Sequence, residues 1–223
     1  MAGTHFGGRT LARSQALQLL FQAEATGRLV SEVLDGDFAL DEGPLDDYAR
    51  QLALGTDGML HELDAVISQT SANWSVSRMP AVDRNLLRIA LYEMLNVNEV
   101  DTAVAIDECV ELARAYGTDE SFRFVNGLLG KVARRLEAGE DVVADALAQA
   151  DAEAEAAAAA EAARAEEAAR AAEEAARAAA EAEDADDSEG YPSSDDAAQD
   201  YDDGFEPYYP DDYPYDSDLP DWV

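Results

Sequence analysis

The sequence predicts an all-α domain followed by a helical extension and an acidic tail. Apolar residues recur at i, i+3 and i+4 through most of residues 10–136, which is the spacing of amphipathic helices. No window alternates apolar and polar residues with a period of two for long enough to indicate a strand. Alanine, the best helix former, fills 24 of the 44 positions from 140 to 183.

The first half of the predicted domain contains three or four helices. Residues 10–26 carry one apolar face, and Gly27 is a typical residue to end that helix. A shorter helix is expected over residues 31–38, before the Asp-Glu-Gly-Pro turn signal at residues 41–44. Residues 45–72 continue the helical pattern, with Gly55 and Gly58 inside it as points where this segment can divide.

The second half begins with the most apolar helix, whose apolar residues run from Leu86 to Leu95, and we expect it to be central because it has little polar face. Pro80 and Asp83 suit the start of that helix, since its first turn tolerates proline and favours an acid. A further helix starts at residue 101 or 102 and ends at Gly117. The last helix of the domain is capped by residue 118 or 119, and its apolar stripe comprises Phe122, Val125, Leu129, Val132 and Leu136.

Charge and composition divide the chain of 223 residues and net charge −34 into four parts. Residues 1–8 are expected to form a disordered arm and residues 9–139 a helical domain. The Ala/Glu-rich segment 140–183 predicts a solvated helix, because it has no large apolar stripe. Residues 184–223 hold 15 acids, no bases, six Tyr and five Pro, a composition typical of disorder. This tail is either a solubility segment or a polyanion that competes with an anionic ligand.

Composition also excludes several classes of protein. No uninterrupted apolar stretch of about 18 residues is present, and the first residues do not resemble a signal peptide, so we expect a cytoplasmic protein without a membrane span. One Cys and two His argue against a disulfide framework and a zinc site, and no motif for a cofactor or a catalytic residue is present. Cys109 lies within an apolar helical pattern and is expected in the core.

Arg9 and Arg13 are the first candidate functional residues. They lie four positions apart on one side of the first helix, and no acid occurs between Met1 and Gln22. Arginine presents a planar set of donors that fits phosphate oxygens, which predicts contact with a nucleic-acid backbone. The alternative is an ordinary solvated helix face.

The turn before the last helix is the second candidate. Phe124 lies two positions from the core residue Phe122 and so faces another side of the helix, next to Arg123, while Tyr116 precedes the turn. Aromatic rings beside an arginine, away from the core, are suited to stacking on unpaired bases. The alternative is a local hydrophobic contact around the start of the helix.

The motifs of this chain resemble those of the NusB family of transcription antitermination factors. The resemblance begins at residues 13–22, Arg-Ser-Gln-Ala-Leu-Gln-Leu-Leu-Phe-Gln. It continues through Asn-Trp-Ser at 73–75, through residues 82–94 with the block Arg-Ile-Ala-Leu-Tyr-Glu, and through 105–114. It ends with Phe-Val-Asn-Gly-Leu-Leu at 124–129. No such resemblance covers residues 140–223.

The resemblance implies an all-α domain of about seven helices in two small packed bundles. It implies a protein that binds the boxA element of ribosomal RNA leader transcripts together with NusE, a small-subunit ribosomal protein, and helps RNA polymerase read through terminators. NusE is then expected to dock on residues 82–101, and a homodimer is possible. The residues that the resemblance assigns to RNA are Arg9, Arg13, Tyr116, Glu120, Arg123 and Phe124.

Two other functions stay open at this point. The same fold could serve as an interaction domain that has lost RNA binding, because the basic patch is thin. A relationship to the N-terminal domain of ribosomal RNA cytosine methyltransferases is the other alternative, although no Gly-rich cofactor loop and no catalytic Cys follow Leu136.

Overall fold

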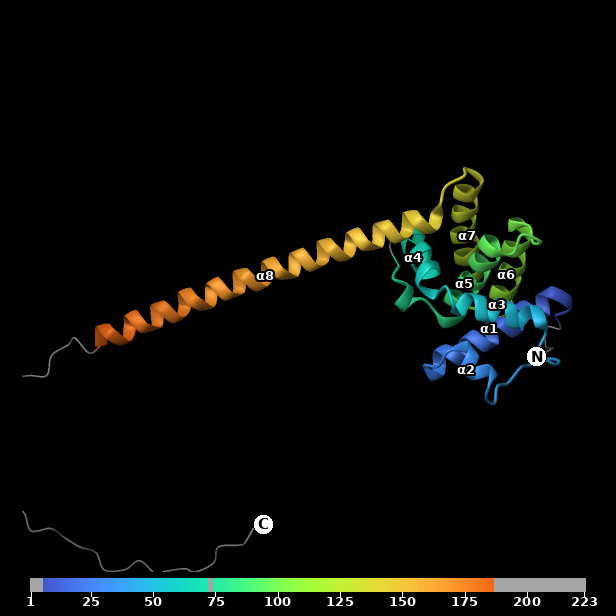
Figure 1. Ribbon diagram of the computed structural model, residues 1–223, viewed down its shortest axis with the longest axis horizontal. Coiled ribbons are helices and arrows are strands. Elements are labelled where there is room, and N and C mark those ends of the chain that lie inside the picture. The colour runs from blue at the N-terminus through green and yellow to red at the C-terminus, as the bar shows by residue number, and fades with distance from the viewer. Residues whose placement is uncertain (1–5, 72–73, 187–223) are drawn as a thin grey trace, which may run out of the picture. The chain divides into compact units, whose positions relative to one another are not determined.

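The computed structural model describes residues 6–71 and 74–186 (Figure 1). Within those ranges the chain forms helices and no strand, so the predicted all-α fold class is confirmed. The predictions for the first five residues of the arm and for residues 187–223 of the tail lie outside the described residues.

The helices follow the predicted order with small differences in their ends. Gly27 adopts φ 64° and ends the first helix, as predicted. The predicted helix over residues 45–72 is divided, since one helix ends at Asp57 and the next begins at Leu60. The elements are α1 Gly8–Thr26, α2 Val30–Leu34, α3 Asp47–Asp57, α4 Leu60–Ser71, a 3-10 turn η1 Val76–Arg78, α5 Ala81–Asn96, α6 Thr102–Tyr116, α7 Ser121–Glu137 and α8 Val142–Asp186.

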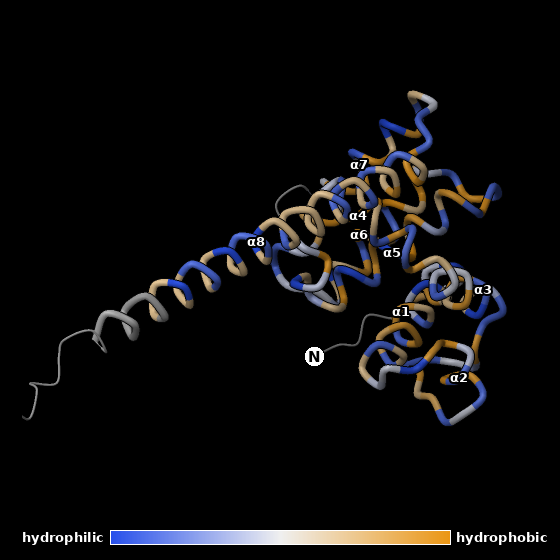
Figure 2. The backbone as a smooth tube through the Cα atoms, turned by 60° about the vertical axis from the view of Figure 1, so that its left-hand side comes forward, coloured by the Kyte–Doolittle hydropathy of each residue, from blue (hydrophilic) through white to orange (hydrophobic). Residues whose placement is uncertain are grey.

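Helices α1–α3 form one small bundle and α4–α7 form another, and α5 packs against helices of both. The α5 residues from Leu86 to Leu91 are all at most 9% exposed, which confirms that this helix is central. Figure 2 shows apolar and polar segments alternating along α1 and α5, as expected for helices that bury most of one side. The buried apolar side chains of both bundles form one continuous core.

The first turns of α8 pack onto the second bundle. Val142 and Ala146 are buried in the common core, although the composition of this segment predicted a solvated helix. Arg135 of α7 bonds to Glu140 at 2.5 Å and to Asp145 at 3.0 Å. From residue 166 onward α8 belongs to a separate unit, and its side chains are exposed through residue 179, as predicted.

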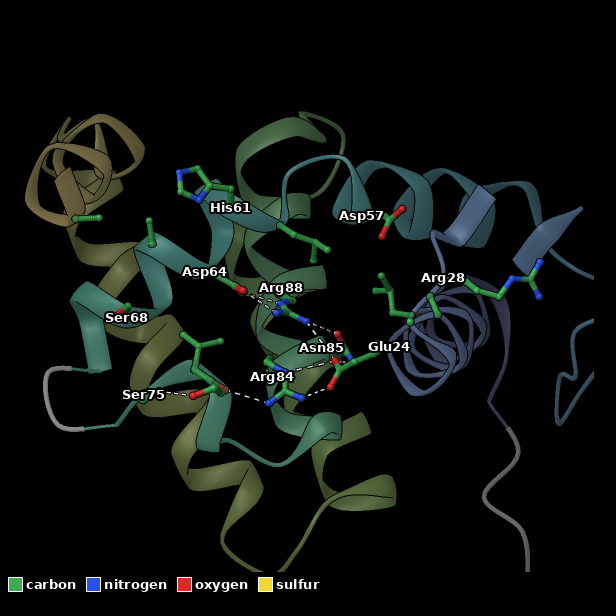
Figure 3. Close-up of a pocket in the computed structure, with 18 residues that line it drawn as sticks. Glu24, Arg28, Asp57, His61, Asp64, Ser68, Ser75, Arg84, Asn85 and Arg88 are labelled. Carbon is green, nitrogen blue, oxygen red and sulfur yellow. Dashed lines mark hydrogen bonds and ion pairs between the residues drawn. The ribbon is translucent and has the colours of Figure 1, made fainter. Parts of the chain in front are cut away.

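A network of charged side chains joins the two bundles (Figure 3). Arg88 of α5 makes two bonds of 2.7 Å to Asp64 of α4 and lies 3.4 Å from Glu24 of α1. Arg84 also pairs with Glu24, and it donates to the carbonyl of Met79 at 2.6 Å. The four charged side chains line a cavity of about 670 Å³ between α1, α4 and α5. Since each of these charges has a partner, the network has a structural explanation.

We expect the Glu24→Gln variant to be less stable than the parent chain at pH 7, with a difference that disappears in acid. Burial opposes ionisation of Glu24, but its bonds to Arg84 and Asn85 outweigh burial and lower the pKa of its carboxyl. A lowered folded-state pKa gives stability that is present above the unfolded value of about 4.3 and is lost as the pH falls through the folded value. Urea denaturation from pH 7 to pH 3 measures this, and a difference independent of pH contradicts it.

Candidate nucleic-acid interface

The two segments predicted to bind RNA meet where α1 passes the end of α6. Tyr116, the last residue of α6, places its hydroxyl 2.7 Å from the hydroxyl of Ser14 in α1. The ring of Tyr116 also lies 6.1 Å from the ring of Phe6, just before α1. The start of α1 and the turn between α6 and α7 are therefore neighbours, although about 100 residues separate them in the sequence.

Arg13 is not on the surface, contrary to both sequence-based interpretations. Its side chain is 1% exposed and makes two bonds to Glu93 of α5, from Nε at 2.9 Å and from Nη2 at 2.7 Å. Its Nη1 lies 3.4 Å from Glu108 of α6. No acid lies near residue 13 in the sequence, but folding brings Glu93 and Glu108 from two later helices to its guanidinium. Arg13 as described is not accessible to a phosphate.

Further polar groups complete the surroundings of this ion pair. The hydroxyl of Tyr48 in α3 donates to Glu93, and the hydroxyl of Thr10 donates to Glu108 at 2.5 Å. Cys109 is fully buried, as predicted, and burial together with the charge of Glu93 raises the pKa of its thiol to about 12. The network fixes α1 against α3, α5 and α6, and the thiol is protonated at neutral pH.

Arg9 is exposed and lies one turn before Arg13. Its guanidinium carbon is 5.0 Å from the centre of the Tyr48 ring, a cation–π contact that orients the side chain. The same tyrosine donates to the buried Glu93. Arg9 is thus held beside the network that buries Arg13, with its own charge accessible to solvent.

Glu120 and Arg123 form an exposed ion pair of 2.9 Å at the start of α7. The guanidinium of Arg123 lies 5.2 Å from the ring centre of Phe122, and that of Arg114 in α6 lies 5.0 Å from the same ring. Phe122 is half-buried, whereas the sequence predicted a core position. Ser121 and Leu128 occupy inner positions with Val125, so α7 is rotated slightly from the predicted orientation.

Phe124 is half-buried and faces a different side of α7 from Phe122. Its ring centre is 5.8 Å from that of Trp74, with a tilt of 50° between the rings. Trp74 is 51% exposed. The two rings line a small cavity of about 100 Å³ that Asp83 also lines. Burial raises the pKa of the Asp83 carboxyl, against the effect of its hydrogen bond with Ser121. Its Oδ1 has no hydrogen-bond partner among the residues that the structure describes.

Trp74 was not among the predicted site residues, although it belongs to the Asn-Trp-Ser block of the resemblance. Arg114 was missed because it contacts the Phe122 ring only through the packing of α6 on α7. A contact between two helices leaves no periodic signal in the sequence of either one.

A groove next to Tyr116 is mainly apolar. It has a volume of about 310 Å³ and runs between α1 and α5, where Leu17, Phe21 and Val82 line it. Phe21 is 46% exposed, which is high for a phenylalanine. A second hollow of about 290 Å³ also borders Tyr116, and Phe6 and Leu11 line it.

The outward face of α7 contains two glycines, Gly127 and Gly130, in the middle of the helix. A side chain added at Gly127 meets no atom within 4 Å, and one added at Gly130 approaches only Arg134, at 3.7 Å. Each glycine costs a helix interior about 0.8–1 kcal/mol relative to alanine. Packing inside the described part of the chain does not explain either glycine.

The model of the NusB family matches residues 10–134. The chain belongs to the NusB family. It is 48% identical over 128 residues to the transcription antitermination protein NusB of Salinispora tropica, covering 56% of this chain and 94% of that protein. It is 40% identical over 129 residues to that of Thermobifida fusca, covering 58% of this chain and 91% of the relative.

A solved structure of T. maritima NusB has the same fold, with a TM-score of 0.52 and 35% identity over 58% of this chain and 93% of that one. The NusB match ends before α8, so that helix lies outside the matched region. Among the described residues, no helix is both long and apolar enough to cross a membrane.

We expect Arg13→Ala to destabilise the fold by about 3–5 kcal/mol, because it leaves the buried carboxylate of Glu93 without its main partner. Arg9→Ala, one turn earlier on the exposed surface, is the matched control and should change stability by less than about 0.5 kcal/mol. Chemical denaturation of both variants measures the two free energies of unfolding. Equal effects of the two substitutions would show that Arg13 is not in a buried ion pair.

Proposed function

We propose that this chain acts in transcription antitermination as a non-enzymatic RNA-binding adaptor. It binds the boxA element of ribosomal RNA leader transcripts together with NusE, and the pair helps RNA polymerase read through terminators. The family of the chain supports this function. So does its similarity to an antitermination protein that it matches over most of that protein's length. The observation that carries the proposal is the proximity of the α1 start to the α6–α7 turn, with exposed arginines and aromatic rings on both.

The proposed roles of the residues follow from their exposure. Arg9 and Arg123 contact phosphates, because both guanidiniums are exposed. Each lies over a neutral ring, which does not cancel its charge, and the ion pair of Arg123 with Glu120 is exposed and therefore weak. Tyr116 and Phe124 offer ring surface for stacking on bases, and the exposed ring of Trp74 extends the surface at Phe124. Glu120 holds Arg123 in place through their ion pair. Its carboxylate accepts hydrogen bonds from the amino groups of bases.

Arg13 has a positioning role in this proposal. It anchors the first helix to Glu93, and the helix carries Arg9 and Ser14, the partner of Tyr116. Loss of Arg13 therefore weakens RNA binding through the fold of the site.

The groove at Phe21 and Val82 is the proposed docking surface for NusE. It borders the first residue of the segment 82–101 that the resemblance assigns to this partner. An exposed phenylalanine next to a mainly apolar groove suits a protein partner, because aromatic residues are enriched in the cores of such interfaces.

Filter binding of boxA RNA to the full chain, alone and with NusE, tests the proposed function. The expected result is specific binding that NusE strengthens. Equal binding of boxA and a scrambled RNA in the presence of NusE would favour an interaction domain that has lost RNA recognition.

Arg9→Gln and Arg123→Gln should each weaken binding of boxA and scrambled RNA to a similar extent. Each variant loses one phosphate contact, so the slope of log affinity against log salt should fall by about 0.7 for single-stranded RNA. Titrations between 50 and 200 mM salt measure the slope. An unchanged slope with a loss confined to boxA would assign these arginines to base recognition.

Phe124→Ala should weaken RNA binding by about 1–3 kcal/mol, because one stacking surface is removed. Phe124 is half-buried, so we expect a smaller loss of folding stability than the roughly 3–5 kcal/mol of a fully buried phenylalanine. Trp74→Ala is the paired variant, since it removes the exposed ring of the same contact. Unchanged RNA affinity in both variants, together with a large loss of stability, would place Phe124 in the core.

A further inference from the structure

The face of α7 opposite its buried side chains carries a row with basic residues at its ends and glycines between them. The row consists, at intervals of three or four residues, of Arg123, Gly127, Gly130 and Arg134, and Lys131 lies at its edge. The buried residues Val125, Leu129 and Val132 occupy the other side of the helix. From Arg123 to Arg134 the row is about 16 Å long, at 1.5 Å per residue.

The cations at the end of the row have no partner in the described part of the chain. Lys131 and Arg134 are exposed, and no ion pair or hydrogen bond of their side chains is found within residues 6–71 and 74–186. Arg135, next in sequence, differs, because Glu140 and Asp145 hold it against α8. Two unpaired cations side by side are notable in a chain of net charge −34.

Further positive charge lies at the beginning of the row. Arg114 and Arg123 both lie within about 5 Å of the Phe122 ring, and both are more than half exposed. Their acidic partners, Glu111 and Glu120, are exposed as well. Exposed ion pairs contribute little free energy, so a phosphate can replace these carboxylates at small cost.

The glycines make the middle of the row flat. Gly127 faces open space, and Gly130 has only the end of Arg134 nearby. Nothing inside the described chain requires a residue without a side chain at these positions. A flat strip between cations lets the backbone of a ligand approach the helix closely.

We propose that this outer face of α7 binds the phosphate backbone of RNA that continues beyond the boxA contact at Arg123 and Phe124. The inference rests on the proposed function and extends it to nucleotides flanking boxA. The row is long enough for several phosphates at about 3.4 Å per nucleotide of a stacked strand. The charge of the row and its continuity with Arg123 favour RNA over a protein partner.

The test is the double variant Lys131→Gln/Arg134→Gln in the full chain with NusE. Binding is measured to boxA RNA alone and to boxA RNA extended by eight nucleotides on its 5′ or its 3′ side. We expect affinity for one of the extended RNAs to fall about tenfold at low salt, with a salt slope smaller by about 1.4. Affinity for boxA alone should stay unchanged. Arg50→Gln/Arg164→Gln, which removes two exposed arginines from α3 and α8, is the control and should affect none of the RNAs.

Gly127→Gln tests close approach separately from charge. It should weaken binding of the same extended RNA about threefold with an unchanged salt slope, while thermal stability stays equal or rises because the site is open.

Several outcomes overturn this inference. If the double variant binds all three RNAs like the parent chain while Arg123→Gln still weakens boxA binding, the inference fails and the proposed function stands. If the double variant loses NusE and keeps RNA, the face is a protein surface. If the parent chain binds no boxA RNA even with NusE, the proposed function fails, and the inference fails with it.

Discussion

The buried ion pair between Arg13 and Glu93 is the interaction on which the rest of the proposed interface depends. It joins α1 to the central helix α5, and Tyr48 and Glu108 extend it to α3 and α6. Removing two charges from water is costly, and the cost is offset only where geometry is good and the remaining polar atoms are bonded. Arg13 meets this condition, with two bonds to one carboxylate and a third contact to another.

Because this pair fixes α1, the start of that helix lies beside the end of α6. Ser14 and Tyr116 meet there, and Arg9 remains exposed on the Tyr48 ring. The domain thus uses its arginines in two ways. Arg13, Arg84, Arg88 and Arg135 are bonded to carboxylates and hold helices together. Arg9, Arg114 and Arg123 lie over aromatic rings, and the last two also form exposed ion pairs with Glu111 and Glu120, so that part of each guanidinium stays accessible to solvent.

The sequence predicts the helices well, because each one shows its own apolar period. The central place of α5, the burial of Cys109 and the end of α1 at Gly27 all follow from local patterns. The site is predicted less well. The partner of Arg13 lies 80 residues away, so the residues around Arg13 suggest a free cation. The rotation of α7 also differs from the expected one, since the small Ser121 takes an inner position and Phe122 is half-buried under two arginines.

Backbone hydrogen exchange of the chain with NusE, in the presence and absence of boxA RNA, shows whether α1 and the α6–α7 turn form one RNA-binding surface. RNA should slow exchange at the start of α1, near Arg9, and from Tyr116 to Phe124, because both segments belong to that surface. Exchange around the cavity between Glu24 and Asp64 should not change on addition of RNA. Protection at that cavity with none at the two segments would show that RNA binds elsewhere on the domain.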